Sequence, residues 1–368
     1  MPLLASESLA KLAEVQSERA RVLPKKFADN PLRTLALNTY QSRNAALDVL
    51  FYDVTSVTKQ ETHHLAASIV HEGDILLVPP TGAGALSIFR SVEDFLAQGP
   101  TAAALAVAGV GSSSLGAAAF ARNVADALGA PVAAVVSGYG LADVLTEALG
   151  GFFFFGGLNS LRHVFESLDT ASQTLSRSLL HSGETRLEQS EGPRWVRTSE
   201  DTRTVLALLR DERFAPDLLI GHSKGNLVIS EALYALVSEA EGRAATLAAE
   251  SRIVTVSAKI GMPTPFYDVF DIMGQYDLFG LFNSRLDLET DYVVPHAWHS
   301  TNPDFAWPGL GTGIHVTPTL KTVLAMPKPA GRSGLPALHG TAATVLDLPQ
   351  RFTAALNQPA AGPSRVLA

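Results

Sequence analysis

Short runs of hydrophobic residues alternate with longer amphipathic segments over much of this chain. Apolar runs bounded by Gly or Pro are typical of strands buried on both faces, whereas apolar residues spaced three and four apart indicate helices. On this basis we expect strands at residues 103–107, 132–136, 218–220, 253–256 and 269–273. Helices are expected at residues 116–128, 199–210 and 227–240, with Ser199 or Thr198 capping the second. This alternation predicts an α/β fold with a mostly parallel central sheet flanked by helices.

The alternation is less regular near both ends of the chain and in its middle. Residues 6–50 are amphipathic and predict helices, and strand-like runs occur at 49–52 and 75–78. A run of four phenylalanines near residue 150, followed by a helical pattern, indicates an insertion. We therefore expect a helical N-terminal extension packed on the core at 1–100, an α/β core at 101–325 with a helical cap insertion at about 145–195, and an Ala/Pro-rich C-terminal segment at 326–368.

Composition narrows the classes of function. With 368 residues, 46% of them hydrophobic and 17% charged, the chain is long and apolar enough to bury a large core. The formal net charge of −8 and the lack of a long basic run argue against nucleic acid as a partner. The chain has no cysteine, which excludes disulfides, thiolate metal sites and a cysteine nucleophile.

Further patterns bear on location and cofactors. The first residues lack the basic and apolar regions of a signal peptide, and the uncharged stretch 101–121 is broken by Gly and Ser. We therefore expect a cytoplasmic protein without an integral membrane span. His63, His64 and His71 have no ligand partner at metal-binding spacing, so we expect neither a metal nor another cofactor. The loop at 109–116 does not have the spacing of a dinucleotide-binding motif.

The strongest candidate for chemistry is the pentapeptide Gly-His-Ser-Lys-Gly at residues 221–225. It follows an expected strand and precedes an expected helix. A serine on such a turn needs small neighbours two residues away on each side, because the strand and the helix nearly touch there. The turn exposes the serine hydroxyl and directs the helix N-terminus at negative charge that develops beside it. These features predict that Ser223 is a nucleophile.

With its flanking elements, this pentapeptide resembles the nucleophile elbow of the α/β-hydrolase superfamily, and a histidine before the serine is frequent in lipases. The resemblance covers about residues 103–320 and points to the lipase and esterase branch. It implies an α/β-hydrolase fold and a serine activated by a histidine that a carboxylate orients. It also implies that serine, acid and histidine follow one another in this order along the chain.

The expected order places the acid and the base after the serine. Asp277 is the best candidate for the acid, because it follows the expected strand at 269–273 and loops after strand ends carry the chemistry in sheets of this class. His299 is the candidate for the base, because it follows a short apolar run on the loop where the resemblance places the catalytic histidine. His296 on the same loop and His315 remain alternatives.

An oxyanion hole would stabilise negative charge on the substrate carbonyl oxygen. The resemblance implies two backbone donors, one from the residue after the serine, Lys224, and one from the loop after an early strand, here Val110 or Gly111. The aromatic run in the insertion either packs in the core or forms part of a lid over an acyl-binding pocket. It consists of Phe152, Phe153, Phe154 and Phe155.

These features predict a serine hydrolase that cleaves carboxylic esters, in which Ser223 forms an acyl-enzyme and Asp277 orients His299. The Phe-rich insertion favours a small-molecule or a lipid or polyester-like ester with an apolar acyl group over a charged substrate. Two alternatives remain open. The same residues would support an acyltransferase or an amidase, and the fold would also suit a non-catalytic binding or scaffold protein.

Overall fold

The computed structural model describes residues 3–4, 7–17, 47–68, 70–98, 101–109, 112–137, 199–285, 288–306, 309 and 311–327. These residues all belong to the first of the two units into which the chain divides, residues 1–331. The second unit is residues 332–368.

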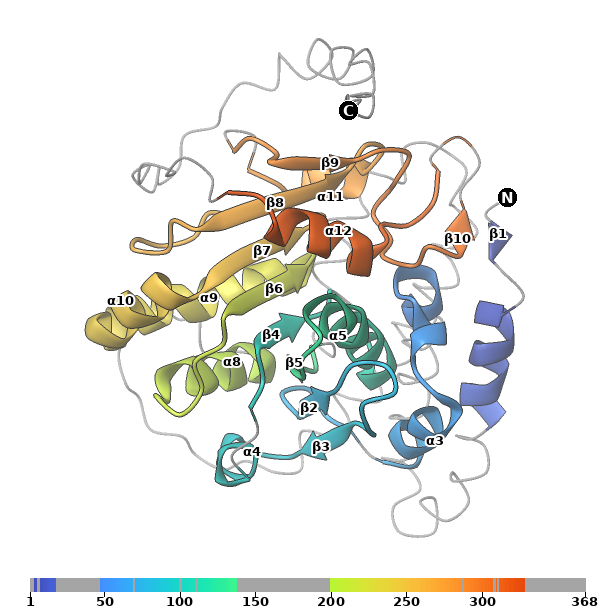
Figure 1. Ribbon diagram of the computed structural model, residues 1–368, viewed down its shortest axis with the longest axis horizontal. Helices are drawn as coiled ribbons and strands as arrows, with labels where there is room; N and C mark the ends of the chain where they lie inside the picture. The colour runs from blue at the N-terminus through green and yellow to red at the C-terminus, as the bar shows by residue number, and fades with distance from the viewer. Residues whose placement is uncertain are drawn as a thin grey trace, which may run out of the picture. The chain divides into compact units, whose positions relative to one another are not determined.

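An eight-stranded sheet organises the described part of the chain (Figure 1). Its strands lie in the order β3-β2-β5-β4-β6-β7-β8-β9. Neighbouring strands from β5 to β9 are parallel, whereas β2 pairs antiparallel with both β3 and β5. The sheet is therefore mostly parallel, and the expected α/β class is confirmed. The bounds are β2 (Ile75–Val78), β3 (Ser87–Phe89), β4 (Ala104–Val107), β5 (Val132–Val135), β6 (Leu218–His222), β7 (Arg252–Val256), β8 (Val269–Gly274) and β9 (Tyr292–Val294).

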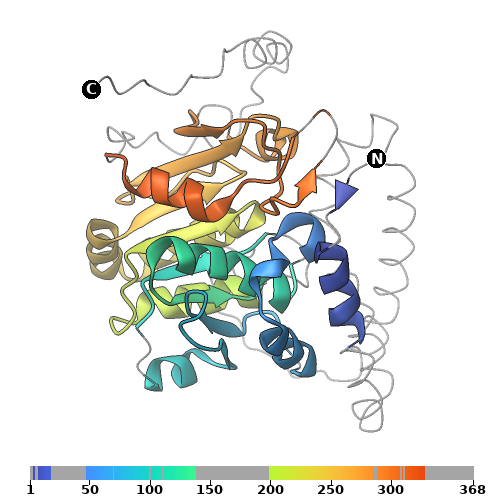
Figure 2. The ribbon, with the colours of Figure 1, turned by 45° about the vertical axis from the view of Figure 1, so that its right-hand side comes forward.

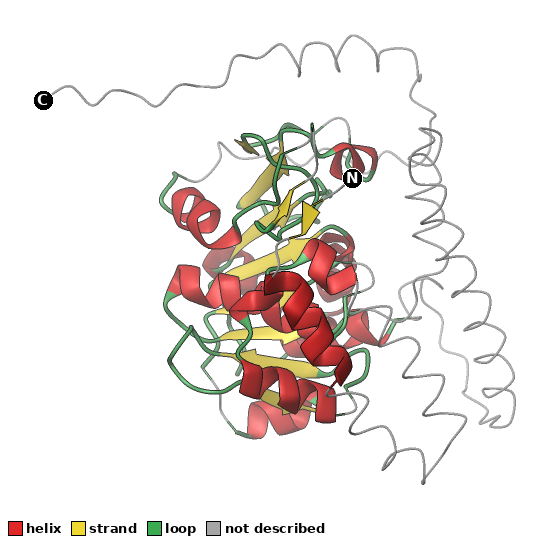
Figure 3. Ribbon diagram, turned by 90° about the vertical axis from the view of Figure 1, so that its right-hand side faces the viewer, coloured by secondary structure: helices red, strands yellow, loops and turns green. Residues whose placement is uncertain are grey.

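Helices cover both faces of this sheet, because alternate residues of a buried strand point to opposite sides. Ala104 and Ala106 of β4 pack with one set of helices, and Leu105 and Val107 pack with the other. The first set is α5 (Ser114–Leu128) and α12 (Val316–Leu324). The second set is α4 (Val92–Ala97), α8 (Glu200–Arg210), α9 (Lys224–Glu239) and α10 (Glu241–Glu250). Figure 3 shows the helices on either side of the strands.

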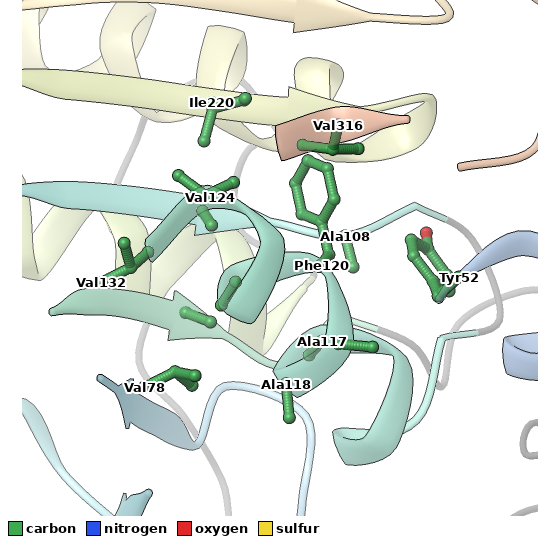
Figure 4. Close-up of a cluster of buried hydrophobic side chains, with 14 of the residues drawn as sticks. Tyr52, Val78, Ala108, Ala117, Ala118, Phe120, Val124, Val132, Ile220 and Val316 are labelled. Atoms are coloured by element: carbon green, nitrogen blue, oxygen red, sulfur yellow. The ribbon is translucent and has the colours of Figure 1, made fainter. Parts of the chain in front are cut away.

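The core on the α5 face combines small and β-branched side chains with the rings of Phe120, Tyr52 and Phe270. Phe120 and Val124 of α5 pack against Val132 and Ile220 of the sheet (Figure 4). Tyr52 belongs to the same cluster and lies at its edge beside Ala108, at the end where β4 leads into its loop. The core thus extends to the carboxyl ends of the parallel strands.

The N-terminal region contacts residues close to the C-terminal end of the described part of the chain. The short strand β1 (Leu3–Leu4) pairs with β10 (Phe305–Ala306). Residues 7–17 and 47–51 are helical, followed by the 3-10 turn η1 (Val54–Ser56) and helix α3 (Lys59–Ala67). In Figure 2 the blue segment from residue 47 lies beside the orange loop that carries β10. A further short helix, α11 (Leu278–Phe282), follows β8.

Two expectations are corrected. Residues 49–51, expected as part of a strand, are helical; the carbonyl groups of this turn accept from side chains of residues 300–302 and, at Phe51, also from the Thr301 amide. Strands β2 and β3 join the main sheet, so the sheet begins inside the part expected to be a helical extension. Periodicity identifies a short apolar run such as β2 but does not say which strands it pairs with.

The expected cap insertion at 145–195, its phenylalanines 152–155 and nearly all of the C-terminal segment lie outside the described residues. Within the described part of the chain, no helix combines the length and the hydropathy that a membrane span requires.

Candidate active site

Ser223 occupies the sharp turn between β6 and α9. It follows the last residue of β6 and precedes Lys224, the first residue of α9. Its backbone has a φ of 53° and a ψ of −119°, a left-handed conformation that residues other than glycine rarely adopt. The Ser223 amide donates to the Val256 carbonyl of β7 at 2.8 Å, which anchors the turn to the sheet. The strand, strained turn and helix expected from the sequence are therefore present.

The two glycines of the pentapeptide allow the close approach that this turn needs. A Cβ atom at Gly221 would lie 2.7 Å from the Asn226 backbone nitrogen, in the first turn of α9. A Cβ atom at Gly225 would overlap the Val107 carbonyl oxygen at the end of β4. Any larger residue at 221 or 225 would push α9 away from β6 or β4, and Ser223 with it.

Ser223, His299 and Asp277 form a continuous row of hydrogen bonds. The Ser223 Oγ lies 3.0 Å from His299 Nε2, and His299 Nδ1 lies 2.8 Å from Asp277 Oδ1. Asp277 follows β8 and His299 follows β9, so the three side chains meet at the carboxyl ends of the parallel strands. Asp277 and His299 are 4% and 7% exposed, which shields the row from competing water.

The hydrogen-bond pattern fixes the roles of the two His299 nitrogens. An ionised carboxylate can only accept, so Nδ1 carries the proton toward Asp277 and Nε2 presents its lone pair to the Ser223 hydroxyl. Asp277 Oδ1 also accepts from the Gly280 amide at 2.6 Å as the N-cap of α11. Oδ1 of the carboxylate is therefore held by two hydrogen bonds, and it keeps the imidazole in the orientation that general-base catalysis requires.

The alternative bases lie elsewhere. His296 is exposed, its ring lies beside Tyr276 and its amide donates to Gln275. His315 is exposed at the N-cap of α12. Among the described residues, the imidazole that is hydrogen-bonded to Ser223 belongs to His299 and not to either of these.

Of the expected oxyanion donors, Lys224 lies within the described residues. Lys224 is the first residue of α9, and the amide of a first helical residue has no acceptor within its own helix. Val110 and Gly111 lie outside the described residues. The amide of Gly109, just before them, donates to the Tyr52 hydroxyl at 2.6 Å, so it is not available to a substrate oxygen.

Two buried residues at the site were not predicted from the sequence. His222 Nε2 lies 2.9 Å from the carbonyl oxygen of His299, and His222 Nδ1 lies 3.0 Å from the Tyr52 hydroxyl. Burial, with a smaller contribution from His299, lowers the pKa of His222 to about 3. Burial also raises the pKa of Tyr52 well above its usual range. The histidine in the pentapeptide was a signal for His222; nothing comparable marked Tyr52, which lies 170 residues away in the chain.

Aromatic rings flank the His299 imidazole on two sides. The Phe51 ring meets it edge-on, with centroids 6.0 Å apart, and the Phe279 ring is tilted against it at 5.6 Å. Phe279 belongs to the apolar helix α11, which also carries Phe282, 56% exposed. The surface beside the imidazole is therefore apolar.

Within the described residues, no cluster of three or more His, Asp or Glu side chains has a metal-binding arrangement. Comparisons of the chain with protein-family models, with curated proteins and with solved structures found no match.

Proposed function

We propose that this protein is a serine hydrolase of the α/β-hydrolase type, which cleaves carboxylic esters with an apolar acyl group through an acyl-enzyme on Ser223. The observation that carries the proposal is the row formed by Ser223, His299 and Asp277, with Oγ to Nε2 at 3.0 Å and Nδ1 to Oδ1 at 2.8 Å. A serine hydroxyl is a weak nucleophile, and such a row supplies both the base and the group that orients it.

In the first half of the reaction, Ser223 Oγ attacks the ester carbonyl carbon while its proton moves to His299 Nε2. The imidazole becomes positively charged, and the adjacent Asp277 carboxylate stabilises it. Negative charge develops on the substrate oxygen, where the Lys224 amide at the start of α9 would donate to it. The proton on Nε2 then passes to the leaving alkoxide, so the alcohol departs and the acyl group remains on Oγ.

In the second half, His299 acts as the base toward water. Nε2 takes a proton from a water molecule as its oxygen attacks the acyl carbon, and then returns that proton to Ser223 Oγ as the carboxylic acid leaves. The same geometry would accept an alcohol in place of water, which is acyl transfer. Product analysis distinguishes the two acceptors.

The family and the substrate class have separate support. Serine, acid and histidine follow β6, β8 and β9 in that order, which is the order of α/β-hydrolases. Phe51 and Phe279 beside His299, together with the Phe-rich insertion in the sequence, favour an apolar acyl group.

A fluorophosphonate probe tests whether Ser223 is a nucleophile. We expect the probe to label wild-type protein on Ser223 and to leave Ser223→Ala unlabelled. Ser230→Ala is the matched control, because Ser230 lies in α9, the helix that follows Ser223, and its hydroxyl donates to the Gly261 carbonyl at 2.8 Å. A folded wild type that resists the probe would instead support the non-catalytic binding protein.

A series of p-nitrophenyl esters tests the substrate class. We expect kcat/KM to rise as the acyl chain lengthens from acetate to octanoate, because each buried methylene contributes about 0.8 kcal/mol of transfer free energy. The matching anilides would distinguish an amidase, and added alcohols would reveal acyl transfer as ester products. A profile that falls from acetate onward would contradict the apolar acyl site.

A further inference from the structure

Tyr52 and His222 form a buried chain of hydrogen bonds behind the proposed nucleophile. Its atoms are the Gly109 amide, the Tyr52 hydroxyl, both nitrogens of His222 and the His299 carbonyl oxygen. The Tyr52 and His222 side chains are almost fully buried, at 2% and 1% exposed. Their rings meet edge-on with centroids 5.4 Å apart.

The donors and acceptors in this series of hydrogen bonds can be assigned in only one way. A carbonyl oxygen cannot donate, so His222 Nε2 carries the proton that it gives to His299. In the neutral ring Nδ1 then accepts, and the Tyr52 hydroxyl donates to it. The lone pairs of that hydroxyl remain free to accept from the Gly109 amide. Burial lowers the pKa of His222 to about 3, which keeps the ring neutral and this assignment unchanged at physiological pH.

Each end of the chain reaches a component of the proposed reaction. One end holds the backbone of His299, whose imidazole lies 3.0 Å from Ser223 Oγ. The Ser257 hydroxyl also approaches this carbonyl, at 3.5 Å, so the shorter contact is from His222. The other end holds Gly109, where an added Cβ would lie 3.1 Å from Ser223 Cβ. Gly109 also leads directly into the loop that is expected to supply an oxyanion donor.

We propose that Tyr52 and His222 are positioning residues, which fix the base His299 and the Gly109 backbone beside Ser223. Neither residue touches the reacting atoms or transfers a proton. They act by holding the base and the Gly109 backbone in register with the nucleophile. This inference rests on the proposed function of Ser223, and it assigns a role in the reaction to the N-terminal segment that contains Tyr52.

Tyr52→Phe tests the proposal with the loss of one oxygen atom. The Gly109 amide loses its acceptor and His222 Nδ1 loses its donor. We expect kcat for a p-nitrophenyl ester to fall by about tenfold to a hundredfold with KM nearly unchanged, because misplacement of catalytic groups affects the transition state more than ground-state binding. Ser251→Ala is the control: it also removes a buried hydroxyl that donates to a carbonyl, that of Pro216, at the opposite ends of the parallel strands.

His222 provides a second, independent pair of variants. His222→Gln keeps an amide donor that can reach the His299 carbonyl, whereas His222→Met has a similar length and no donor. We expect His222→Gln to retain a kcat about tenfold above that of His222→Met, at similar thermal stability. A purely structural role would make the two variants equal in kcat.

The outcomes separate this inference from the proposed function. If the fluorophosphonate fails to label the folded wild type, both fall. If the wild type is labelled, the inference alone is overturned by a Tyr52→Phe variant with wild-type kcat, by one that changes only KM, or by equal kcat values in the two His222 variants.

Discussion

Ser223 combines backbone strain with the proposed chemistry in a single residue. A left-handed conformation at a residue with a Cβ costs on the order of 1–3 kcal/mol, and Ser223 has a φ of 53°. The neighbouring structure maintains this conformation, because the Ser223 amide is bonded to Val256 and α9 packs directly on β4 through Gly225. The hydroxyl is thereby directed out of the turn toward His299.

The strain predicts an unusual order of stability for two variants at position 223. Ser223→Gly relieves the strain, whereas Ser223→Ala keeps it, so we expect the glycine variant to be the more stable by about 1 kcal/mol after its greater unfolded-state entropy is subtracted. Urea unfolding of the two variants measures the difference directly. Both lack the nucleophile, so loss of activity does not complicate the comparison. A glycine variant that is the less stable of the two would show that the turn is not strained.

At the scale of elements, the junction of β6, α9 and β4 is the feature that places the nucleophile. The first turn of α9 lies against the ends of both strands, with Gly225 next to the Val107 carbonyl. The Asn226 side chain crosses to the end of β7 and donates to the Val256 and Ala258 carbonyls at 3.0 and 3.1 Å. The N-terminus of α9 is thus fixed to three adjacent strands, and a displacement there would move Ser223.

Gly225→Ala is expected to disrupt this junction. The added methyl group would overlap the Val107 carbonyl, so we expect a loss of about 3 kcal/mol or more in the free energy of unfolding. Gly242→Ala is the matched control in α10, where an added Cβ meets nothing within 4 Å; it should be neutral or stabilising by about 0.5 kcal/mol. Denaturant unfolding of both variants provides the test. Equal stabilities would mean that α9 does not pack closely on β4 at the Val107 carbonyl.

The elements that could be predicted from the sequence are those whose pattern is local. The expected strand at 132–136 and helix at 199–210 correspond closely to β5 and α8. The hydrophobic pattern within each of these segments is sufficient to indicate its secondary structure. Ser223, Asp277 and His299, which the structure brings together, could be selected from the pentapeptide, from the apolar runs before Asp277 and His299, and from the chain order that the resemblance implies.

Features that depend on contacts distant in sequence could not be predicted. Residues 49–52 were expected to form a strand because they are a short apolar run in which Val, Phe and Tyr favour strands. Residues 49–51 are instead part of a helical turn, in which the Val49 and Leu50 carbonyls are bonded by Asn302 and Ser300. The pairing of β2 with β5 was hidden for a similar reason. No local pattern specifies a partner strand that lies more than fifty residues away.

At the scale of the whole described unit, the segment around residue 50 joins the N-terminal region to the loop of the base. Ser300 and Thr301 bond the carbonyls of Leu50 and Phe51, which precede them by 250 residues. Asn302, fully buried, donates to the Val49 carbonyl at 2.6 Å and accepts from the Asp304 amide at 2.9 Å. The loop that carries His299 is therefore held by this segment as well as by the sheet.

Asn302→Ala should loosen this connection without touching the row at Ser223. The Val49 carbonyl would lose its partner in a buried setting, which costs about 2 kcal/mol. We expect the Thr301 amide, which donates to the Phe51 carbonyl at 2.8 Å, to exchange with solvent at least about tenfold faster. Ser251→Ala, distant from this loop, should leave that rate unchanged. Unaltered exchange in Asn302→Ala would argue that the sheet alone holds the loop.

The buried histidine also links the site to the acid stability of the whole unit. In the unfolded chain His222 titrates near the usual value of about 6.5, whereas burial lowers its folded pKa to about 3. Between these values the unfolded state binds the additional proton, so the free energy of unfolding rises with pH. The stabilisation is complete above pH 6.5 and is lost as the pH falls toward 3, by up to about 1.4 kcal/mol per pH unit.

His222→Gln isolates this contribution, because every other titrating group is shared by the two proteins. We expect the free energy of unfolding of the wild type to exceed that of His222→Gln by most at pH 7. This difference should shrink by about 1.4 kcal/mol per pH unit between pH 6 and pH 4. Urea unfolding at each pH measures the difference. Parallel curves for the two proteins would mean that His222 takes up a proton in the folded state near its ordinary pKa, which its burial between Tyr52 and His299 argues against.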